Sequence, residues 1–306
     1  MALERGGTRY KNMVWNHERW DGFPLRSDDI VIATPPKCGT TWMQMQVALL
    51  LFRTPDLPGP LASLSPWLDM NTRPKDEVWA QLAAQTHRRF IKTHTPLDGL
   101  PWDDGITYVH VARDPRDAGL SWDNHMGNVD QEKFFMARVA AVGLDDLAEL
   151  GIDGPPPAPS DDPAERFWTW VEGDGSGSSM FEGLVRNCQS YWEARHRPNV
   201  HLFHYGVQQQ DLSREMTRLA VALGVEPPTP ELVEAAGFAT MKSRADELIP
   251  NSDTPFWRSN QQFFDKARHG EWAGLMADGG AERYDTALRA ITTDEDFIAW
   301  LHDGRA

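Results

Sequence analysis

The sequence predicts an α/β fold in which a central parallel sheet is flanked by helices. Two observations lead to this prediction. Short apolar runs rich in β-branched residues have the length of buried strands, and they lie at 30–33, 89–95, 106–112 and 200–205. Longer stretches with helical spacing separate these runs, at 43–52, 75–85, 180–195 and 212–223. Such alternation favours a parallel sheet that is buried on both faces.

The length and composition are those of an ordinary globular chain. The 306 residues are 41% hydrophobic and 25% charged, and they suffice for one large domain or two smaller ones. We find no internal repeat and expect a single domain over 1–306. A proline-rich stretch and a Gly/Ser-rich stretch are too short to separate domains, so 126–180 is expected to be an elaboration of the same domain.

Charge, hydropathy and cysteine content limit the partners. The formal net charge of −15 argues against a nucleic-acid binder, which would carry a basic face, so an anionic ligand would need a local basic pocket. No apolar run approaches the roughly 20 residues of a membrane span, and the first residues lack the apolar core of a secretory signal. We therefore expect a cytoplasmic protein without a membrane span. Cys38 and Cys188 lie far apart, and no metal-ligand spacing is evident, so we expect no bound metal.

The first predicted strand leads into a loop suited to bind an anion. Residues 30–42 read IVIATPPKCGTTW, and the long apolar helix follows. The glycine lets the backbone approach a ligand, while unpaired N–H groups and a partial positive charge at the helix N-terminus favour an anion. Lys37 adds a full charge, and Thr40 and Thr41 add hydroxyl donors. The alternative is a plain strand–turn–helix corner with Lys37 in solvent.

Polar residues mark the end of the second predicted strand. Lys92 and His94 stand just before Pro96, which ends the strand. Side chains two residues apart on a strand point to the same side, and the strand ends of an open parallel sheet are where ligands bind. The alternative for His94 is a structural histidine held by hydrogen bonds.

Arg113 and Ser121 follow the third predicted strand. Asp114 is expected to cap a helix that begins at the proline after it. Arg113 then lies at the strand end and Ser121 about two turns into the helix, so both can reach a second anion. The alternative for Arg113 is an ion pair with Asp114 or Asp117.

These three motifs, in this order, resemble those of the cytosolic-type sulfotransferases, which use 3′-phosphoadenosine 5′-phosphosulfate (PAPS) as donor. The resemblance covers about residues 28–275, the expected core, and implies the P-loop-like fold of that family. It implies that the 5′-phosphosulfate is held by Lys37, Cys38, Gly39, Thr40 and Thr41. It also implies the other site residues: Trp42 on adenine, Arg113 and Ser121 on the 3′-phosphate, His94 as the catalytic base, and Lys92 on the transferring group.

Later segments resemble the family more loosely. Tyr205 matches a tyrosine of the nucleotide pocket, and Phe238 and Met241 match an adenine contact. Residues 263–272, FFDKARHGEW, resemble the C-terminal nucleotide-binding element of the family. The candidate contacts within this element are Phe264, Lys266 and Arg268.

The chain departs from the family at three positions. Cys38 stands where serine is usual, which removes a hydroxyl donor. Asp265 and Ala267 replace an arginine and a glycine, so the 3′-phosphate would depend there on Lys266, helped by Arg268. The C-terminal dimer motif of the family is not recognisable, which leaves the oligomeric state open.

The motifs imply in-line transfer of a sulfuryl group from PAPS to a hydroxyl or amine. His94 would accept the acceptor's proton, and Lys37 and Lys92 would stabilise charge on the leaving oxygen without a metal. One alternative is a P-loop kinase or NTPase, but there the lysine follows the second glycine, whereas Lys37 precedes Gly39. Another is a nucleotide-binding module without turnover.

The acceptor is the least specified part of the prediction. Several tryptophans fall in or near expected loops and would line either an aromatic pocket or the core: Trp67, Trp102, Trp122, Trp168, Trp170 and Trp257. A small hydrophobic alcohol or phenol is the leading expectation, and a carbohydrate or a peptide tyrosine is the alternative.

Overall fold

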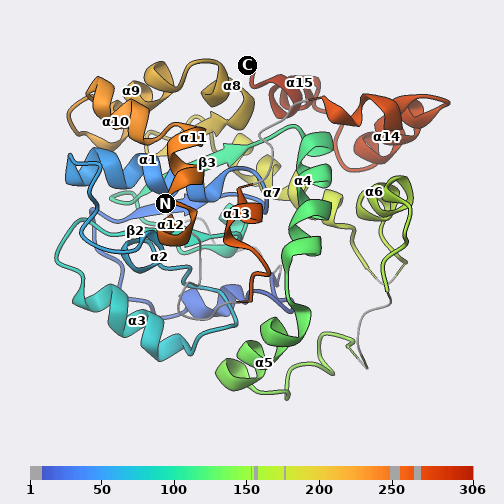
Figure 1. The fold of residues 1–306 in the computed structure, drawn as a ribbon, viewed down its shortest axis with the longest axis horizontal. Helices are drawn as coiled ribbons and strands as arrows, with labels where there is room; N and C mark the ends of the chain where they lie inside the picture. Colours follow the sequence, from blue (N-terminus) through green and yellow to red (C-terminus); the bar gives the residue numbers. More distant parts are fainter. Residues whose placement is uncertain are drawn as a thin grey trace.

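The computed structural model describes residues 9–152, 154, 158–175, 177–248, 256–264 and 270–305. Its centre is a four-stranded parallel sheet in the order β2-β1-β3-β4 (Figure 1). The strands are β1 (Ile30–Ala33), β2 (Phe90–Thr93), β3 (Thr107–Ala112) and β4 (Val200–His204). Ile30 pairs with Phe90 on one side and Thr107 on the other. The predicted α/β class with a parallel sheet is confirmed.

Both faces of the sheet are buried. Ile30 and Ile32 belong to one apolar cluster, whereas the intervening Val31 and the following Ala33 belong to another. This alternation follows from the two-residue period of a strand. The first face packs against α1 (Thr40–Phe52), α9 (Leu212–Leu223) and α10 (Pro230–Ala235), and the second against α3 (Lys75–Ala84) and α7 (Met180–Glu193).

Helix boundaries follow local capping chemistry. The side chain of Asp114 accepts a hydrogen bond from the Arg116 N–H, and the proline after it is the first residue of α4 (Pro115–Asn128). The C-terminus of α9 is also capped: the helix ends at Gly224, which has the left-handed φ of 65° that glycine tolerates best. The predicted strand at 200–205 is one residue shorter than expected, because Tyr205 begins α8 (Tyr205–Gln210).

The remaining elements surround this core. They are η1 (His17–Trp20), α2 (Leu61–Leu64), η2 (Leu97–Gly99), α5 (Gln131–Val142), α6 (Pro163–Glu172), α11 (Phe238–Ser243), α12 (Ala245–Leu248), α13 (Asn260–Phe263), η3 (Glu271–Met276), α14 (Gly280–Arg289) and α15 (Glu295–Asp303). Within residues 126–180, Phe167 of α6 packs in one cluster with Phe297 of α15. Helix α5, which belongs to the same stretch of sequence, lies at the lower edge of the view in Figure 1. Every helix in the described ranges is too short or too polar to cross a lipid bilayer.

All four strands end at the same edge of the sheet. The residues that follow them are Thr34, His94, Arg113 and Tyr205. Because parallel strands point the same way, the polar motifs that the sequence places at separate strand ends meet at this edge.

Candidate active site

A cavity of about 1430 Å³ lies at this edge, and most of the predicted site residues line it. They are Lys37, Gly39, Thr40, Thr41, Trp42, Lys92, His94, Arg113, Ser121, Tyr205, Phe238, Met241 and Phe264. The side chain of Cys38 is fully buried in the core instead, and burial raises the pKa of its thiol to about 12. Lys266 and Arg268 fall outside the described residues.

The loop before α1 has the backbone of an anion cradle. Gly39 caps the helix with φ 95°, and within the described residues no side chain caps the first N–H groups of α1. A Cβ at Gly39 would come within 2.7 Å of the Tyr205 ring, so glycine is required both for the φ angle and for the close approach. Thr40 shares a hydrogen bond with Thr34 through their hydroxyl groups, which ties the loop to the end of β1. These features fit a phosphosulfate at the helix N-terminus.

Lys37 points toward a histidine that the sequence motifs do not single out. Its Nζ lies 3.3 Å from Nδ1 of His125 and 5.3 Å from the ring centroid of Phe263. Burial lowers the pKa of His125 well below 6.5, and the charges of Lys37 and Lys92 lower it further. The imidazole is therefore neutral and accepts a hydrogen bond from the Lys37 ammonium.

His125 could have been found from its spacing. It lies four residues after Ser121 on α4, and side chains at that spacing share one face of a helix. A site residue at Ser121 thus implies that the side chain one turn later faces the same cavity.

Lys92 is almost fully buried beneath an aromatic ring. Its Nζ lies 4.1 Å from the ring centroid of Trp67. Burial lowers the pKa of Lys92 to about 7, with Asp69 opposing this change and Lys37 adding to it. The ammonium form at neutral pH thus depends on one buried carboxylate.

Asp69 joins the segment before β2 to the strand itself. Its carboxylate is fully buried and accepts hydrogen bonds from the hydroxyl of Thr95 at 2.6 Å and from Nε1 of Trp67 at 2.6 Å, as well as from Trp20 and Thr93. Burial raises the pKa of Asp69, and the hydrogen bonds from these four donors oppose the rise because they stabilise the ionised carboxylate. Asp69 thereby holds both the ring that covers Lys92 and the turn that carries His94.

His94 is fixed in one tautomer. Its Nδ1–H donates to the carbonyl of Thr34 at 2.5 Å, so Nε2 carries the free lone pair. Burial lowers the pKa of His94 well below 6.5, and Lys92 lowers it further. The ring centroid lies 4.5 Å from that of Trp67 and 5.8 Å from that of Trp15. The arrangement is that of a neutral base in an apolar, aromatic setting.

Arg113 faces the loop between β1 and α1, residues 34–39, which we call the anion loop. Its Nη1 donates to the Lys37 carbonyl at 3.1 Å, and its guanidinium lies 4.6 Å from the ring centroid of Tyr205. The buried Nε has no hydrogen-bond partner within the described structure. The alternative interpretation required an ion pair of Arg113 with Asp114 or Asp117, but among the described residues Asp114 pairs with Arg116 at 2.7 Å and Asp117 accepts from the Gly270 N–H at 3.0 Å. Arg113 thus keeps donor capacity for a ligand.

Aromatic and apolar residues form the wall beside the loop. The Trp42 ring meets Tyr205 edge-on with centroids 5.2 Å apart, and its Nε1–H donates to the carbonyl of Ala236. Phe238 is 37% exposed, whereas Met241 is buried in the core below it. A partly exposed aromatic wall of this kind suits a planar base.

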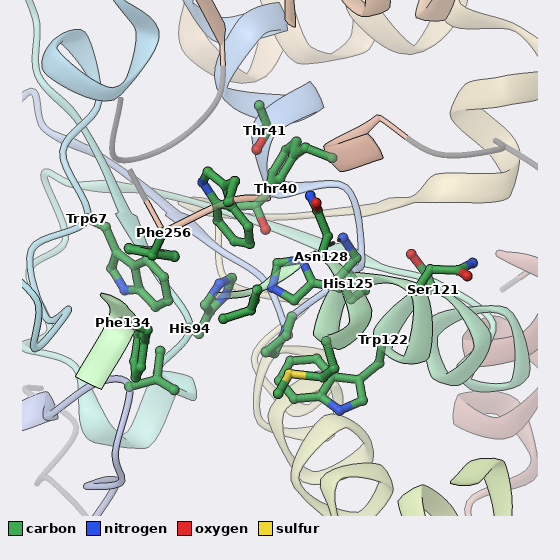
Figure 2. Close-up of a pocket in the computed structure, with 18 of the residues that line it drawn as sticks. Thr40, Thr41, Trp67, His94, Ser121, Trp122, His125, Asn128, Phe134 and Phe256 are labelled. Atoms are coloured by element: carbon green, nitrogen blue, oxygen red, sulfur yellow. Dashed lines mark hydrogen bonds between the residues drawn. The ribbon is translucent and has the colours of Figure 1, made fainter. Parts of the chain in front are cut away.

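Apolar side chains line the cavity beside His94. Figure 2 shows Trp67, Phe134 and Phe256 gathered on one side of His94, with Ser121 on the other side. We group the apolar lining residues of the segments 13–15, 67–70 and 129–152, together with Phe256, as the apolar arm: Met13, Val14, Trp15, Trp67, Met70, Val129, Phe134, Phe135, Leu144, Leu147, Ile152 and Phe256. Gln131 and Glu132 of α5 line the same cavity.

The six tryptophans divide between the cavity and other packing. Trp67, Trp122 and Trp257 line the cavity. Trp170 is buried in the core. The two others pack elsewhere, Trp102 on Tyr108 and Trp168 under Arg283.

The end of α4 is clasped to the segment 256–259. The amide of Asn128 donates to the Ser259 carbonyl at 2.8 Å and accepts from the Ser259 N–H at 2.9 Å. The next residue, Val129, forms an antiparallel bridge with Trp257. These contacts hold 256–259 against the cavity.

Comparison with known proteins agrees with this geometry. The sequence model of the sulfotransferase domain matches residues 27–299. A glycolipid sulfotransferase of Mycobacterium bovis is 39% identical over 97% of this chain and 94% of its own length, and one of Mycobacterium tuberculosis shows the same values.

Solved structures share the fold at lower identity. Retinol dehydratase in a complex with retinol and PAP aligns with a TM-score of 0.67 and 19% identity, covering 90% of this chain and 84% of that one. Mouse sulfotransferase SULT7A1 complexed with PAP aligns with a TM-score of 0.66 and 18% identity, covering 94% of both chains. The chain therefore belongs to the sulfotransferase family, which confirms the fold and the PAPS-dependent enzyme class that its motifs predicted.

Proposed function

We propose that the protein transfers the sulfuryl group of PAPS to the hydroxyl of a hydrophobic small molecule, with His94 as the base. The observation that carries this proposal is the position of His94. It lines the same cavity as the loop before α1, Lys37, Lys92 and the apolar arm, and Figure 2 shows Trp67 and Phe134 on one side of it. Donor and acceptor would therefore meet at this histidine.

The residues around the loop fit the donor. The N-terminus of α1 and Lys37 would hold the phosphosulfate, and Arg113 and Ser121 would hold the 3′-phosphate. The unpartnered Nε of Arg113 supports this assignment. Trp42 and Phe238 offer the wall for adenine. PAPS supplies the activated sulfuryl group.

The chain's own residues would then assist the transfer. The hydrogen bond from His94 to the Thr34 carbonyl presents Nε2 as the proton acceptor for the hydroxyl. Lys37 and Lys92 bring positive charge to the leaving oxygen. Lys37 would leave its resting contact with His125 to do so.

The apolar arm supports a hydrophobic acceptor. The arm offers many apolar side chains, so desolvation favours an alkyl or aromatic body with one hydroxyl near the base, while Gln131 and Glu132 line the cavity beside it. The names of two relatives, a glycolipid sulfotransferase and a retinol dehydratase bound to retinol, are compatible with this proposal.

The activity is tested by measuring transfer of labelled sulfate from PAPS and of labelled phosphate from ATP, each with and without a chelator. We expect sulfate transfer that the chelator leaves nearly unchanged, because protein cations meet the charge on the leaving oxygen. Magnesium-dependent phosphate transfer without sulfate transfer would instead establish the kinase alternative. Binding of PAPS without product in a single turnover would establish the non-catalytic module.

A pH profile tests the role of Lys92. We expect kcat/KM for PAPS to fall as the pH rises through about 7, because Lys92 then loses its charge in the free enzyme. Asp69→Asn removes the carboxylate that supports the ammonium, so the fall should move to lower pH. Three other groups lie near Lys92. The charge of Lys37 lowers the pKa of Lys92, while His94 and His125 stay neutral because their own pKa values lie well below 6.5. A uniform loss of activity with an unmoved profile would make Asp69 purely structural.

We also propose that 1–306 form a single domain in the cytoplasm. The match over 27–299 and the packing of α6 with α15 in one cluster support the first part. The cytoplasmic location stays a prediction from the sequence.

A further inference from the structure

Exposed apolar side chains are concentrated on and after α5. Seven large hydrophobic residues are substantially exposed in the described structure, and four of them fall within residues 135–144. They are Phe135 (38%), Met136 (61%), Val142 (37%) and Leu144 (52%), and we call them the α5 patch. Exposed apolar side chains gathered in one segment are typical of a binding surface.

The α5 patch is continuous with the apolar arm. Phe135 and Leu144 belong to both, because each is exposed at the surface and also lines the cavity. Phe134 and Trp15 line the same cavity, and the ring of Trp15 packs beside that of His94. The cavity that holds the base thus reaches exposed apolar residues on and after α5.

The cations near the α5 patch are engaged with acids. Lys11 pairs with Glu149 at 2.7 Å, Lys133 with Asp130 at 3.0 Å, and Arg138 with Asp146. A surface that binds anionic lipids needs a cluster of available Lys or Arg, and these paired cations do not provide one. The net charge of −15 also opposes an anionic membrane. An uncharged surface is the complementary one.

We propose that the α5 patch docks on an uncharged lipid surface, from which an amphiphilic acceptor enters the apolar arm with its hydroxyl at His94 and its alkyl chain leading back to the patch. This proposal rests on the proposed function and names the acceptor class. A protein seated on the patch would cover Phe135 and Leu144 and close this end of the cavity. A lipid surface would instead supply the molecule that fills it.

Flotation with phosphatidylcholine vesicles tests the docking without any substrate. We expect the wild type to float with the vesicles and Met136→Asp/Val142→Asp to bind at least about tenfold more weakly, since two apolar contacts are replaced by charges. Neither residue lines the cavity. The matched control is Val221→Asp on α9, which is 75% exposed outside the patch and should float like the wild type.

Kinetics with two alcohols links docking to transfer. We expect the double variant to lose about tenfold in kcat/KM for hexadecanol in phosphatidylcholine vesicles and nothing for dissolved hexanol, because only the first must leave a lipid surface. Equal loss for both alcohols would overturn the proposal. The proposal would also be overturned if the wild type did not bind the vesicles. It would likewise be overturned if the wild type were a dimer and the double variant a monomer. Absence of transfer to either alcohol, with flotation intact, would count against the proposed function instead.

Discussion

His94→Ala is expected to abolish sulfuryl transfer while the affinity for the desulfated nucleotide, PAP, stays within a few-fold of the wild type. The substitution removes the proton acceptor that the Thr34 carbonyl holds in place, and a positioned general base contributes about 10²- to 10⁴-fold to a rate. The nucleotide should still bind because the anion loop and Arg113 are unchanged. Initial rates with PAPS and calorimetric titration with PAP measure the two quantities.

The control for this substitution is His196→Ala. His196 is exposed and does not line the cavity, so its loss should leave transfer unchanged. Transfer near the wild-type rate in His94→Ala would remove the histidine from the proposed mechanism. Loss of PAP binding together with transfer would mean that the substitution damages the whole site.

Arg113→Ala is expected to lower selectivity for PAPS over adenosine 5′-phosphosulfate, which lacks the 3′-phosphate. A charge-assisted hydrogen bond contributes about 1.5 to 3 kcal/mol, so the ratio of the two kcat/KM values should fall roughly ten- to a hundredfold. The guanidinium is held by the Lys37 carbonyl and the Tyr205 ring. We expect it to contact the 3′-phosphate of PAPS and to make no such contact with adenosine 5′-phosphosulfate.

Arg116→Ala provides the comparison for this effect. Arg116 is three residues away, pairs with Asp114 and covers the ring of Trp272 at 3.7 Å, but it does not line the cavity. Its loss should leave the selectivity as it is, whatever it does to stability. If Arg113→Ala lowers kcat/KM equally for both donors, Arg113 supports the loop and does not bind the 3′-phosphate.

Local patterns were sufficient to predict much of this site. The strand, the tight loop and the helix after Ile30 are encoded by adjacent residues, since the glycine, the prolines and the apolar helix each act on their own neighbours. The ends of the other strands could be read in the same way. Their convergence followed from the parallel sheet alone.

Long-range contacts could not be predicted in this way. Asp69 belongs to no motif, and its partners Thr93 and Thr95 are more than twenty residues away in sequence. The sheet order, with β1 between β2 and β3, also depends on pairings that no local pattern specifies. The α5 patch was hidden for a related reason, because an apolar helix segment gives the same pattern whether tertiary packing covers it or not.

The hydrogen bonds between Asn128 and Ser259, which form the clasp, connect the two parts of the cavity. The same helix, α4, carries Ser121 and His125 on the donor side and ends in the clasp, while the clasped segment presents Phe256 to the apolar arm. We therefore expect the nucleotide and the acceptor to affect each other's binding through this contact. By thermodynamic reciprocity, any factor by which bound nucleotide raises the affinity for acceptor must equal the factor by which bound acceptor raises the affinity for nucleotide.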